Sequence, residues 1–179
     1  KDSPIPVGTF HTLGNGLKIH YHEVGRKQAG RPTVLCLHGG GPGASGYSNY
    51  KKNLPFLEAA GYHAIAPDLL GFGLSDKPED LDYTSVLHVE TMRDLLVGIG
   101  VDKVVPIGNS LGGSVVLEYT LDYPETVEKL VLMAPGGVED PATFWGKTEG
   151  GVALADFART DDGSEASFRK VLGLLVHDE

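Results

Sequence analysis

Residues 104–122 constrain the fold most, because an apolar strand, a glycine-bracketed serine and a helix follow one another without a gap. The run Val104–Ile107 leads into Gly108-Asn109-Ser110-Leu111-Gly112, and a helix is predicted from Ser114 to Asp122. A serine on so sharp a turn takes a strained backbone conformation, and side chains two residues before and after it would collide. Its hydroxyl is then exposed above the sheet, where the N–H groups of the helix start favour a developing negative charge. This context is typical of a nucleophilic serine, although a five-residue pattern can also be an ordinary glycine-rich turn.

Composition narrows the function classes. The 179 residues correspond to one domain, and the net charge of −9 argues against nucleic acid and anionic membranes as partners. No apolar stretch approaches the ~20 residues of a membrane span, and the start at Lys1 lacks the apolar run of a signal peptide. The single cysteine, Cys36, lies in the apolar run 33–37, which predicts a buried structural thiol. These features predict a cytoplasmic protein.

The chain is expected to open with an antiparallel hairpin. Strand-like runs at 9–13 and 17–24 are joined by Gly14-Asn15-Gly16, whose Asn-Gly pair suits a tight turn. His20 and His22 fall on one face of the second run, where they could hold a metal. No third ligand can be placed near them, and an exposed strand face is the more common explanation.

From Thr33 onward, short apolar strands alternate with helices, which predicts a parallel sheet covered on both faces. Strands are expected at 33–37, 63–66, 103–107 and 129–133, and helices at 48–60, 84–99 and 114–122. Near Gly136 the alternation of apolar strands and helices gives way to a stretch of turn-forming residues. This change predicts a core domain at 1–135 and the beginning of a lid or cap at 136–179. Within that second part, residues 165–176 are predicted to form an amphipathic helix.

A second glycine-rich motif, His38-Gly39-Gly40-Gly41-Pro42-Gly43, directly follows the strand 33–37. Its backbone therefore lies at the carboxyl edge of the sheet, as Ser110 does. Glycines there let backbone N–H groups approach a ligand oxygen without interference from side chains. A loop of this type supplies half of an oxyanion hole, and the N–H of Leu111 supplies the other half.

Two other interpretations of the same region are weaker. Gly41–Gly46 is formally Gly-x-Gly-x-x-Gly, and Asp68 follows at the spacing of a dinucleotide fold, but an antiparallel hairpin precedes it and residues 108–112 stay unexplained. A phosphate-binding P-loop is excluded because no Lys-Ser or Lys-Thr follows Gly46. Asp68 and Asp76 are predicted to be loop and capping groups. His38 is predicted to hold the glycine loop, and none of the seven histidines is a convincing base.

With these residues in hand, the chain resembles the α/β-hydrolase superfamily. Within it the chain is most similar to the meta-cleavage-product hydrolases, serine enzymes that cut carbon-carbon bonds in ring-opened aromatic compounds. Residues 37–50, 108–113 and 132–137 carry the resemblance. It implies an α/β-hydrolase fold, that is, a mostly parallel sheet with an N-terminal antiparallel hairpin, helices on both faces and the start of a helical lid, with the C-terminal part of the fold missing.

The resemblance also implies roles for individual residues. Ser110 would be the nucleophile, Gly40 and Leu111 would donate the oxyanion-hole N–H groups, and Gly41, Asn49 and Asn109 would contact or orient the substrate. It implies no cofactor and no metal, a small-molecule substrate of the 2-hydroxy-6-oxo-dienoate type, and a homo-oligomer of the full-length chain.

The triad is the main departure from the family. In α/β-hydrolases the order is Ser, then Asp or Glu, then His, and the resemblance implies that the last two lie beyond Glu179. We therefore expect a longer or split hydrolase that needs the remainder of the fold, with the strand 129–133 otherwise left as an exposed edge. Two alternatives stay open: an esterase or proline-iminopeptidase-like hydrolase on the same fold, and a non-catalytic ligand-binding homologue.

Overall fold

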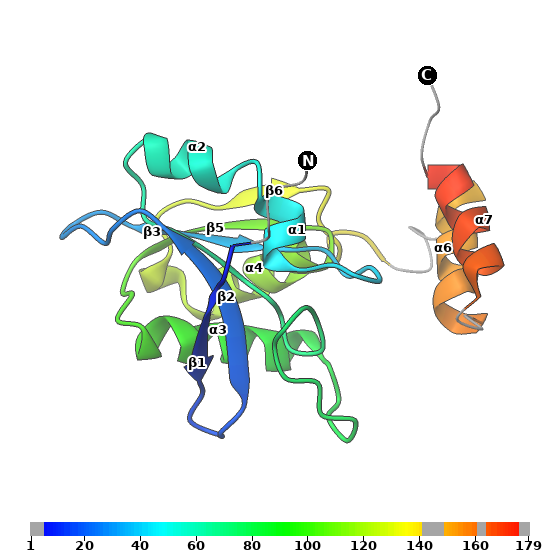
Figure 1. Ribbon diagram of the computed structural model, residues 1–179, viewed down its shortest axis with the longest axis horizontal. Helices are drawn as coiled ribbons and strands as arrows, with labels where there is room; N and C mark the ends of the chain where they lie inside the picture. Colours follow the sequence, from blue (N-terminus) through cyan, green and yellow to red (C-terminus); the bar gives the residue numbers. More distant parts are fainter. Residues whose placement is uncertain (1–5, 141–148, 161–163, 176–179) are drawn as a thin grey trace. The chain divides into compact units, whose positions relative to one another are not determined.

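The computed structural model in Figure 1 describes residues 6–140, 149–160 and 164–175. The chain divides into two units, Lys1–Gly136 and Gly137–Glu179. The first unit contains the sheet and every residue singled out for the site. Whether the second acts as a lid stays a prediction.

The first unit is built on a six-stranded sheet with the order β1-β2-β4-β3-β5-β6. The strands are β1 Thr9–Thr12, β2 Lys18–Val24, β3 Thr33–Leu37, β4 Ala64–Pro67, β5 Val104–Asn109 and β6 Val131–Met133. Strand β2 pairs antiparallel with both β1 and β4, whereas β3 pairs parallel with β4 and β5, and β5 pairs parallel with β6. The predicted parallel sheet with an antiparallel N-terminal hairpin is confirmed.

Helices cover both faces of this sheet, as Figure 1 shows for α2 on one side and α3 on the other. They are α1 Gly46–Tyr50, α2 Leu54–Ala59, α3 Ser85–Gly98 and α4 Leu111–Asp122, followed by the short 3-10 turn Pro124–Thr126. Successive residues of β3 point to opposite faces. Val34 and Cys36 therefore pack in one apolar cluster with the α1 and α2 side, and Leu35 and Leu37 pack in another with α3 and α4.

The helix predicted over 48–60 is wrong in one respect, because it is two helices. Helix α1 ends at Tyr50, and α2 begins at Leu54 with Pro55 in its first turn. A proline lacks the N–H that would bond four residues back, and it disfavours helical geometry in the residue before it. Pro55 is tolerated only at a helix start, so the chain breaks between the two segments.

Strand β6 lies at one edge of the sheet in the described part of the chain. The exposed fractions of Val131, Leu132 and Met133 are 41%, 38% and 43%. The expectation of an exposed apolar edge is thus confirmed for the residues that the structure describes. Such an edge presents unpaired backbone groups and apolar side chains to any strand that meets it.

The second unit contains two helices, α6 Glu149–Thr160 and α7 Glu165–Leu175. They contact each other, and the rings of Phe157 and Phe168 lie 6.1 Å apart. The helix predicted over 165–176 is confirmed as α7 for the residues described, whereas α6 was not predicted. None of the helices in the described ranges has both the length and the apolar character that a membrane crossing requires.

Candidate active site

Ser110 lies between β5 and α4 in a backbone conformation that residues with side chains rarely adopt. Its φ is 50° and its ψ is −112°. The residue is exposed, and its hydroxyl has no hydrogen-bond partner among the residues that the structure describes. The Ser110 N–H donates to the Met133 carbonyl at 3.1 Å, and the Ser110 carbonyl accepts from the Gly136 N–H at 2.9 Å. The backbone is held in place while the hydroxyl stays available.

The two glycines that bracket Ser110 are required by space. A Cβ at Gly108 would overlap the carbonyl oxygen of Gly112, and a Cβ at Gly112 would overlap the carbonyl oxygen of Leu37 and lie 2.6 Å from that of His38. Backbone oxygens cannot move aside without shifting their strands. The predicted collision is confirmed, and it shows that the elbow packs directly on the end of β3.

The glycine loop and the elbow meet at this edge, because β3 and β5 are paired neighbours with Leu37 opposite Gly108. A Cβ at Gly39 would lie 3.3 Å from Ser110 Cβ, and a Cβ at Gly40 would lie 2.9 Å from Leu111 Cδ2. Within the described residues, neither the Gly40 N–H nor the Leu111 N–H has an acceptor. The structure thus brings together Ser110, Gly40 and Leu111, and it leaves two unpaired backbone donors beside the serine.

The two asparagines of the predicted site bond to each other. Asn49 Oδ1 accepts from the Gly39 N–H at 3.1 Å and from Asn109 Nδ2 at 3.1 Å. The oxygen of Asn49 is therefore committed to the glycine loop and to the residue before the serine. Contact of either side chain with a substrate stays a prediction.

Gly41 lines a cavity of about 520 Å³ beside the glycine loop. The cavity is bounded by residues 40–44, residues 71–73 and Lys77. A Cβ at Gly41 would meet nothing within 4 Å, so its side-chain position faces open space. The Gly41 carbonyl accepts from the Ala44 N–H at 2.9 Å, which closes a turn in the loop.

His38 is fully buried and holds the start of the glycine loop. Its Nδ1 lies 2.8 Å from the carbonyl of Gly39, and its Nε2 accepts from the Leu69 N–H at 3.0 Å. These partners assign the proton to Nδ1, because a carbonyl oxygen can only accept. Burial lowers the pKa of His38, against smaller raising effects of the Gly39 carbonyl and Asp68. The predicted structural role of this histidine is confirmed.

Asp68 and Asp76 both accept backbone N–H groups, as predicted. Asp68 accepts from Gly46 and Leu74, and Asp76 accepts from Lys18 at 2.8 Å. In the dinucleotide interpretation Asp68 would bind a ribose. Its carboxylate is instead buried and occupied by groups of the chain itself.

The two histidines of β2 were expected to lie on an exposed strand face, and this is wrong. His20 is 3% exposed and His22 is 6% exposed. His20 Nδ1 lies 2.9 Å from Asp68 Oδ2, and the His20 ring contacts that of His22 edge-on at 4.9 Å. Burial lowers the pKa of His22, and His20 lowers it further, whereas Asp68 acts in the opposite direction. Over the described ranges no group of three or more His, Cys, Asp or Glu side chains is arranged to hold a metal, so the structure adds no third ligand.

Sequence reasoning missed the buried His20–Asp68 pair, because His20 lies on β2 and Asp68 lies 48 residues later, in the loop that follows β4. The pair looks like the acid and base of a triad. However, Asp68 Oδ2 also accepts the Leu74 N–H, and the Ser110 hydroxyl bonds to neither residue. It is a structural contact within the described part of the chain.

Comparison with known proteins decides the family. A family model for the alpha/beta hydrolase fold matches residues 32–179, which include both the glycine loop and the elbow. The chain belongs to the α/β-hydrolase fold family. Both the fold and the family expected from the sequence are confirmed.

Within this family, the chain is similar to several named hydrolases. It is 36% identical over 165 residues to a 2-hydroxy-6-oxononadienedioate/2-hydroxy-6-oxononatrienedioate hydrolase of Paraburkholderia phymatum, covering 92% of the chain and 56% of the relative. It is 39% identical over 124 residues to a 2-hydroxy-6-oxo-6-phenylhexa-2,4-dienoate hydrolase of Burkholderia cepacia, covering 69% and 42%. The chain thus spans about half the length of the curated relatives it matches.

Solved structures agree with these matches. A meta-cleavage product hydrolase from Pseudomonas fluorescens superposes with a TM-score of 0.76 at 30% identity, covering 93% of this chain and 56% of that one. A 2-hydroxy-6-oxo-6-phenylhexa-2,4-dienoate hydrolase from Rhodococcus gives 0.70 at 28% identity, covering 92% and 58%. The expected resemblance to the meta-cleavage-product hydrolases is confirmed as a similarity of sequence and fold.

Proposed function

We propose that this chain carries the nucleophile half of a serine hydrolase that cleaves a carbon-carbon bond in a ring-opened aromatic 2-hydroxy-6-oxo-dienoate. One observation carries the proposal: Ser110 is exposed beside Gly40 and Leu111, and within the described ranges its hydroxyl and their two N–H groups have no hydrogen-bond partner. The named relatives supply the substrate class, since those matched over most of this chain act on dienoates of this kind.

The proposed chemistry uses the two N–H groups where charge develops. The dienol first becomes a ketone, and water or Ser110 then adds to the distal carbonyl to give a tetrahedral oxyanion. Gly40 and Leu111 donate to that oxygen, and a fixed donor of this kind typically contributes about 100-fold to 1000-fold in rate. The carbon-carbon bond then breaks, and its electron pair leaves with the other fragment as a stabilised enol. Across the full reaction, the hydroxyl of one water ends on the acyl carbon and its proton ends on the departing fragment.

Asn109 and Asn49 are proposed to orient the polar end of the substrate. The shared oxygen of Asn49 fixes both amides next to the serine. Gly41 is proposed to line the binding site, because it borders the cavity beside the glycine loop.

The base that activates Ser110 is proposed to come from outside the described residues. In this family the acid and the histidine follow the serine in chain order. The only histidine after Ser110 in the sequence is His177, which lies outside the described residues. We propose that the whole protein includes further chain that completes the triad, and that it is a cytoplasmic homo-oligomer. The intact mass of the cellular protein tests whether it includes further chain, and its mass by light scattering tests whether it is a homo-oligomer.

The complete gene product should therefore consume 2-hydroxy-6-oxo-6-phenylhexa-2,4-dienoate, which is followed by the loss of its long-wavelength absorbance. Ser110→Ala should bind this dienoate and lose turnover, because the Ser110 hydroxyl either attacks the distal carbonyl or activates the water that does. Faster turnover of p-nitrophenyl acetate or of a proline arylamide would instead favour the esterase or iminopeptidase alternative. Tight binding of a ligand with no turnover by the wild type would favour the non-catalytic alternative.

A further inference from the structure

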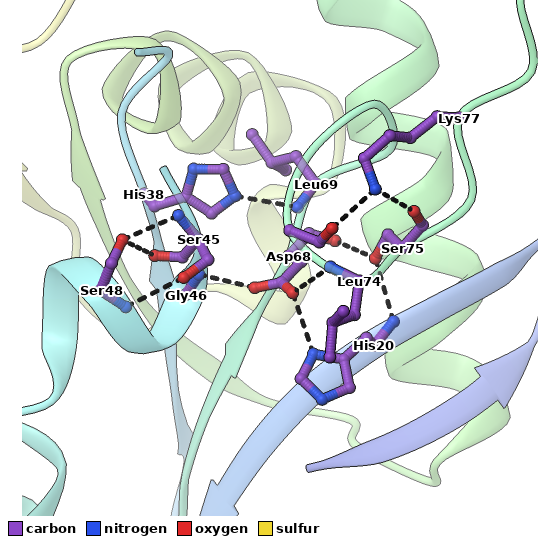
Figure 2. A network of polar contacts seen from close by, with 11 residues as sticks. His20, His38, Ser45, Gly46, Ser48, Asp68, Leu69, Leu74, Ser75 and Lys77 are labelled. Atoms are coloured by element: carbon purple, nitrogen blue, oxygen red, sulfur yellow. Dashed lines mark hydrogen bonds and ion pairs between the residues drawn. The ribbon is translucent and has the colours of Figure 1, made fainter. Parts of the chain in front are cut away.

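A single buried carboxylate connects three segments of the chain near the candidate oxyanion hole. Asp68, which directly follows β4, is 2% exposed. Its Oδ1 accepts from the Gly46 N–H at 2.7 Å, and its Oδ2 accepts from the Leu74 N–H at 2.9 Å and faces His20 Nδ1 at 2.9 Å (Figure 2). Asp68 thus joins the start of α1, which follows the glycine loop, to the loop after β4 and to strand β2.

The next residue, Leu69, holds the other end of the glycine loop. The Leu69 N–H donates to His38 Nε2 at 3.0 Å, and His38 Nδ1 in turn bonds to the Gly39 carbonyl. The segment 38–46, which contains the glycine loop and ends at the first residue of α1, is therefore attached at both His38 and Gly46 to two adjacent residues of another loop. Figure 2 shows both attachments in one view.

Further hydrogen bonds surround these two attachments. Ser45 and Ser48 cap α1 reciprocally, with each hydroxyl accepting the N–H of the other residue at 2.9–3.0 Å. The Ser75 hydroxyl donates to the Asp68 carbonyl at 2.6 Å and accepts from the His20 N–H at 2.9 Å. Hydrogen bonds therefore support both partners of the Gly46–Asp68 contact, at the start of α1 and in the loop after β4.

A carboxylate suits this position because three polar hydrogens converge on it. An ionised carboxylate only accepts, and its two oxygens offer about four lone-pair sites. An asparagine would have to turn its NH₂ group toward either Gly46 or Leu74, which are both donors. Hydrogen bonds to a charged acceptor are also stronger than neutral ones.

We infer that Asp68 is a positioning residue for the oxyanion hole, acting through the Gly46 attachment on the placement of the Gly40 N–H. This inference rests on the proposed function, because it assigns to Gly40 an oxyanion to bind. Asp68 itself is buried, and within the described residues it bonds to none of Ser110, Gly40 and Leu111. Since misplacing a catalytic group by about 1 Å can cost about 100-fold, release of the loop end should be felt in kcat.

The test compares Asp68→Ala with Asp76→Ala in the complete gene product. Asp76 is a matched control, because it lies in the same loop and also accepts a backbone N–H, but from Lys18 in the hairpin. Asp68→Ala should lower kcat for the dienoate by about tenfold to 100-fold while KM changes by less than about threefold. Asp68→Asn, which retains one acceptor, should restore part of the loss, and Asp76→Ala should match the wild type.

A second readout separates a positioning role from a general loss of structure. Phenylboronic acid forms a tetrahedral adduct with an active serine, and such an adduct uses the oxyanion hole. Its inhibition constant should rise in Asp68→Ala by about the same factor as kcat falls, because both report the developing oxyanion. Unchanged kcat and boronate affinity in a folded Asp68→Ala variant would overturn the inference, as would equal losses in Asp76→Ala.

Two outcomes are kept apart by this design. If the wild type does not consume the dienoate, the proposed function fails, whereas the boronate ratio between wild type and Asp68→Ala still tests the positioning role. If Asp68→Ala does not fold, Asp68→Asn takes its place, because it keeps the size of the side chain and replaces one of the two acceptor oxygens by a donor group. Loss of boronate affinity in that folded variant supports the fixed-loop account, and wild-type affinity contradicts it.

Discussion

Gly112→Ala should strongly destabilise the fold, because the added methyl group meets only backbone atoms. The new Cβ would overlap the carbonyl oxygen of Leu37 and lie 2.6 Å from that of His38, where nothing but backbone can yield. Overpacking of this kind costs about 1–3 kcal/mol, and we expect the upper end because β3 and α4 must separate. For a chain of this size, about 3 kcal/mol corresponds to a fall in Tm of roughly 6–12 °C.

Gly41→Ala is the control for this prediction, used for stability alone. Its Cβ would meet nothing within 4 Å, so its Tm should stay within about 2 °C of the wild type. Thermal unfolding followed by circular dichroism measures both variants against the wild type. A Gly112→Ala variant that melts with Gly41→Ala would refute the reasoning, because it would show that the elbow does not rest on the end of β3.

Three further predictions concern strain, acid and thiol reactivity. The free energy of unfolding of Ser110→Gly should exceed that of Ser110→Ala by about 1 kcal/mol, because glycine tolerates the φ of 50° without strain. Denaturant titrations of the two variants measure this difference. Burial lowers the pKa of His22, His38 and His88, so the unfolded chain binds more protons below about pH 6.5. The contribution of these histidines to the free energy of unfolding should therefore be fully present above that pH, and it should be lost as the pH falls from there toward the lowered native pKa values. In His88→Phe the free energy of unfolding should fall less steeply with pH, which urea titrations at several pH values can measure. Burial raises the pKa of the Cys36 thiol to about 12, so a disulfide reagent at pH 8 should label it only after denaturation, and rapid labelling of the native protein would contradict its burial.

Local patterns in the sequence predicted the parts of the site that are adjacent along the chain. Ser110 with its two glycines, and the loop that begins at His38, follow from residue spacing and from the strand before each motif. Their meeting follows from one further rule, since parallel strands end at the same edge of a sheet. The structure adds the register, with Leu37 opposite Gly108, that brings Gly40 against Leu111.

Contacts between distant segments could not be read from the sequence. Periodicity places His20 and His22 on one face of β2, but it does not say which face is covered, and they are in fact buried, with the His22 ring against Tyr47 of α1. Pro55 in the sequence indicates the break before α2, because a proline disfavours helical geometry in the residue before it. Helix α6 begins with Glu149 and two glycines, and because glycine has a low helix propensity this start does not predict a helix.

Strain in the described chain is concentrated where the elbow meets the turn after β6. Ser110 and Ala134 are the two non-glycine residues with positive φ in that part, at 50° and 42°. Each such conformation costs of order 1–3 kcal/mol and persists only where neighbouring contacts fix it. Here the bonds from Ser110 N–H to Met133 and from Gly136 N–H to Ser110 supply that constraint. A core drawn to end at residue 135 would cut the second of these bonds, so Gly136 belongs with the nucleophile rather than with the segment that follows.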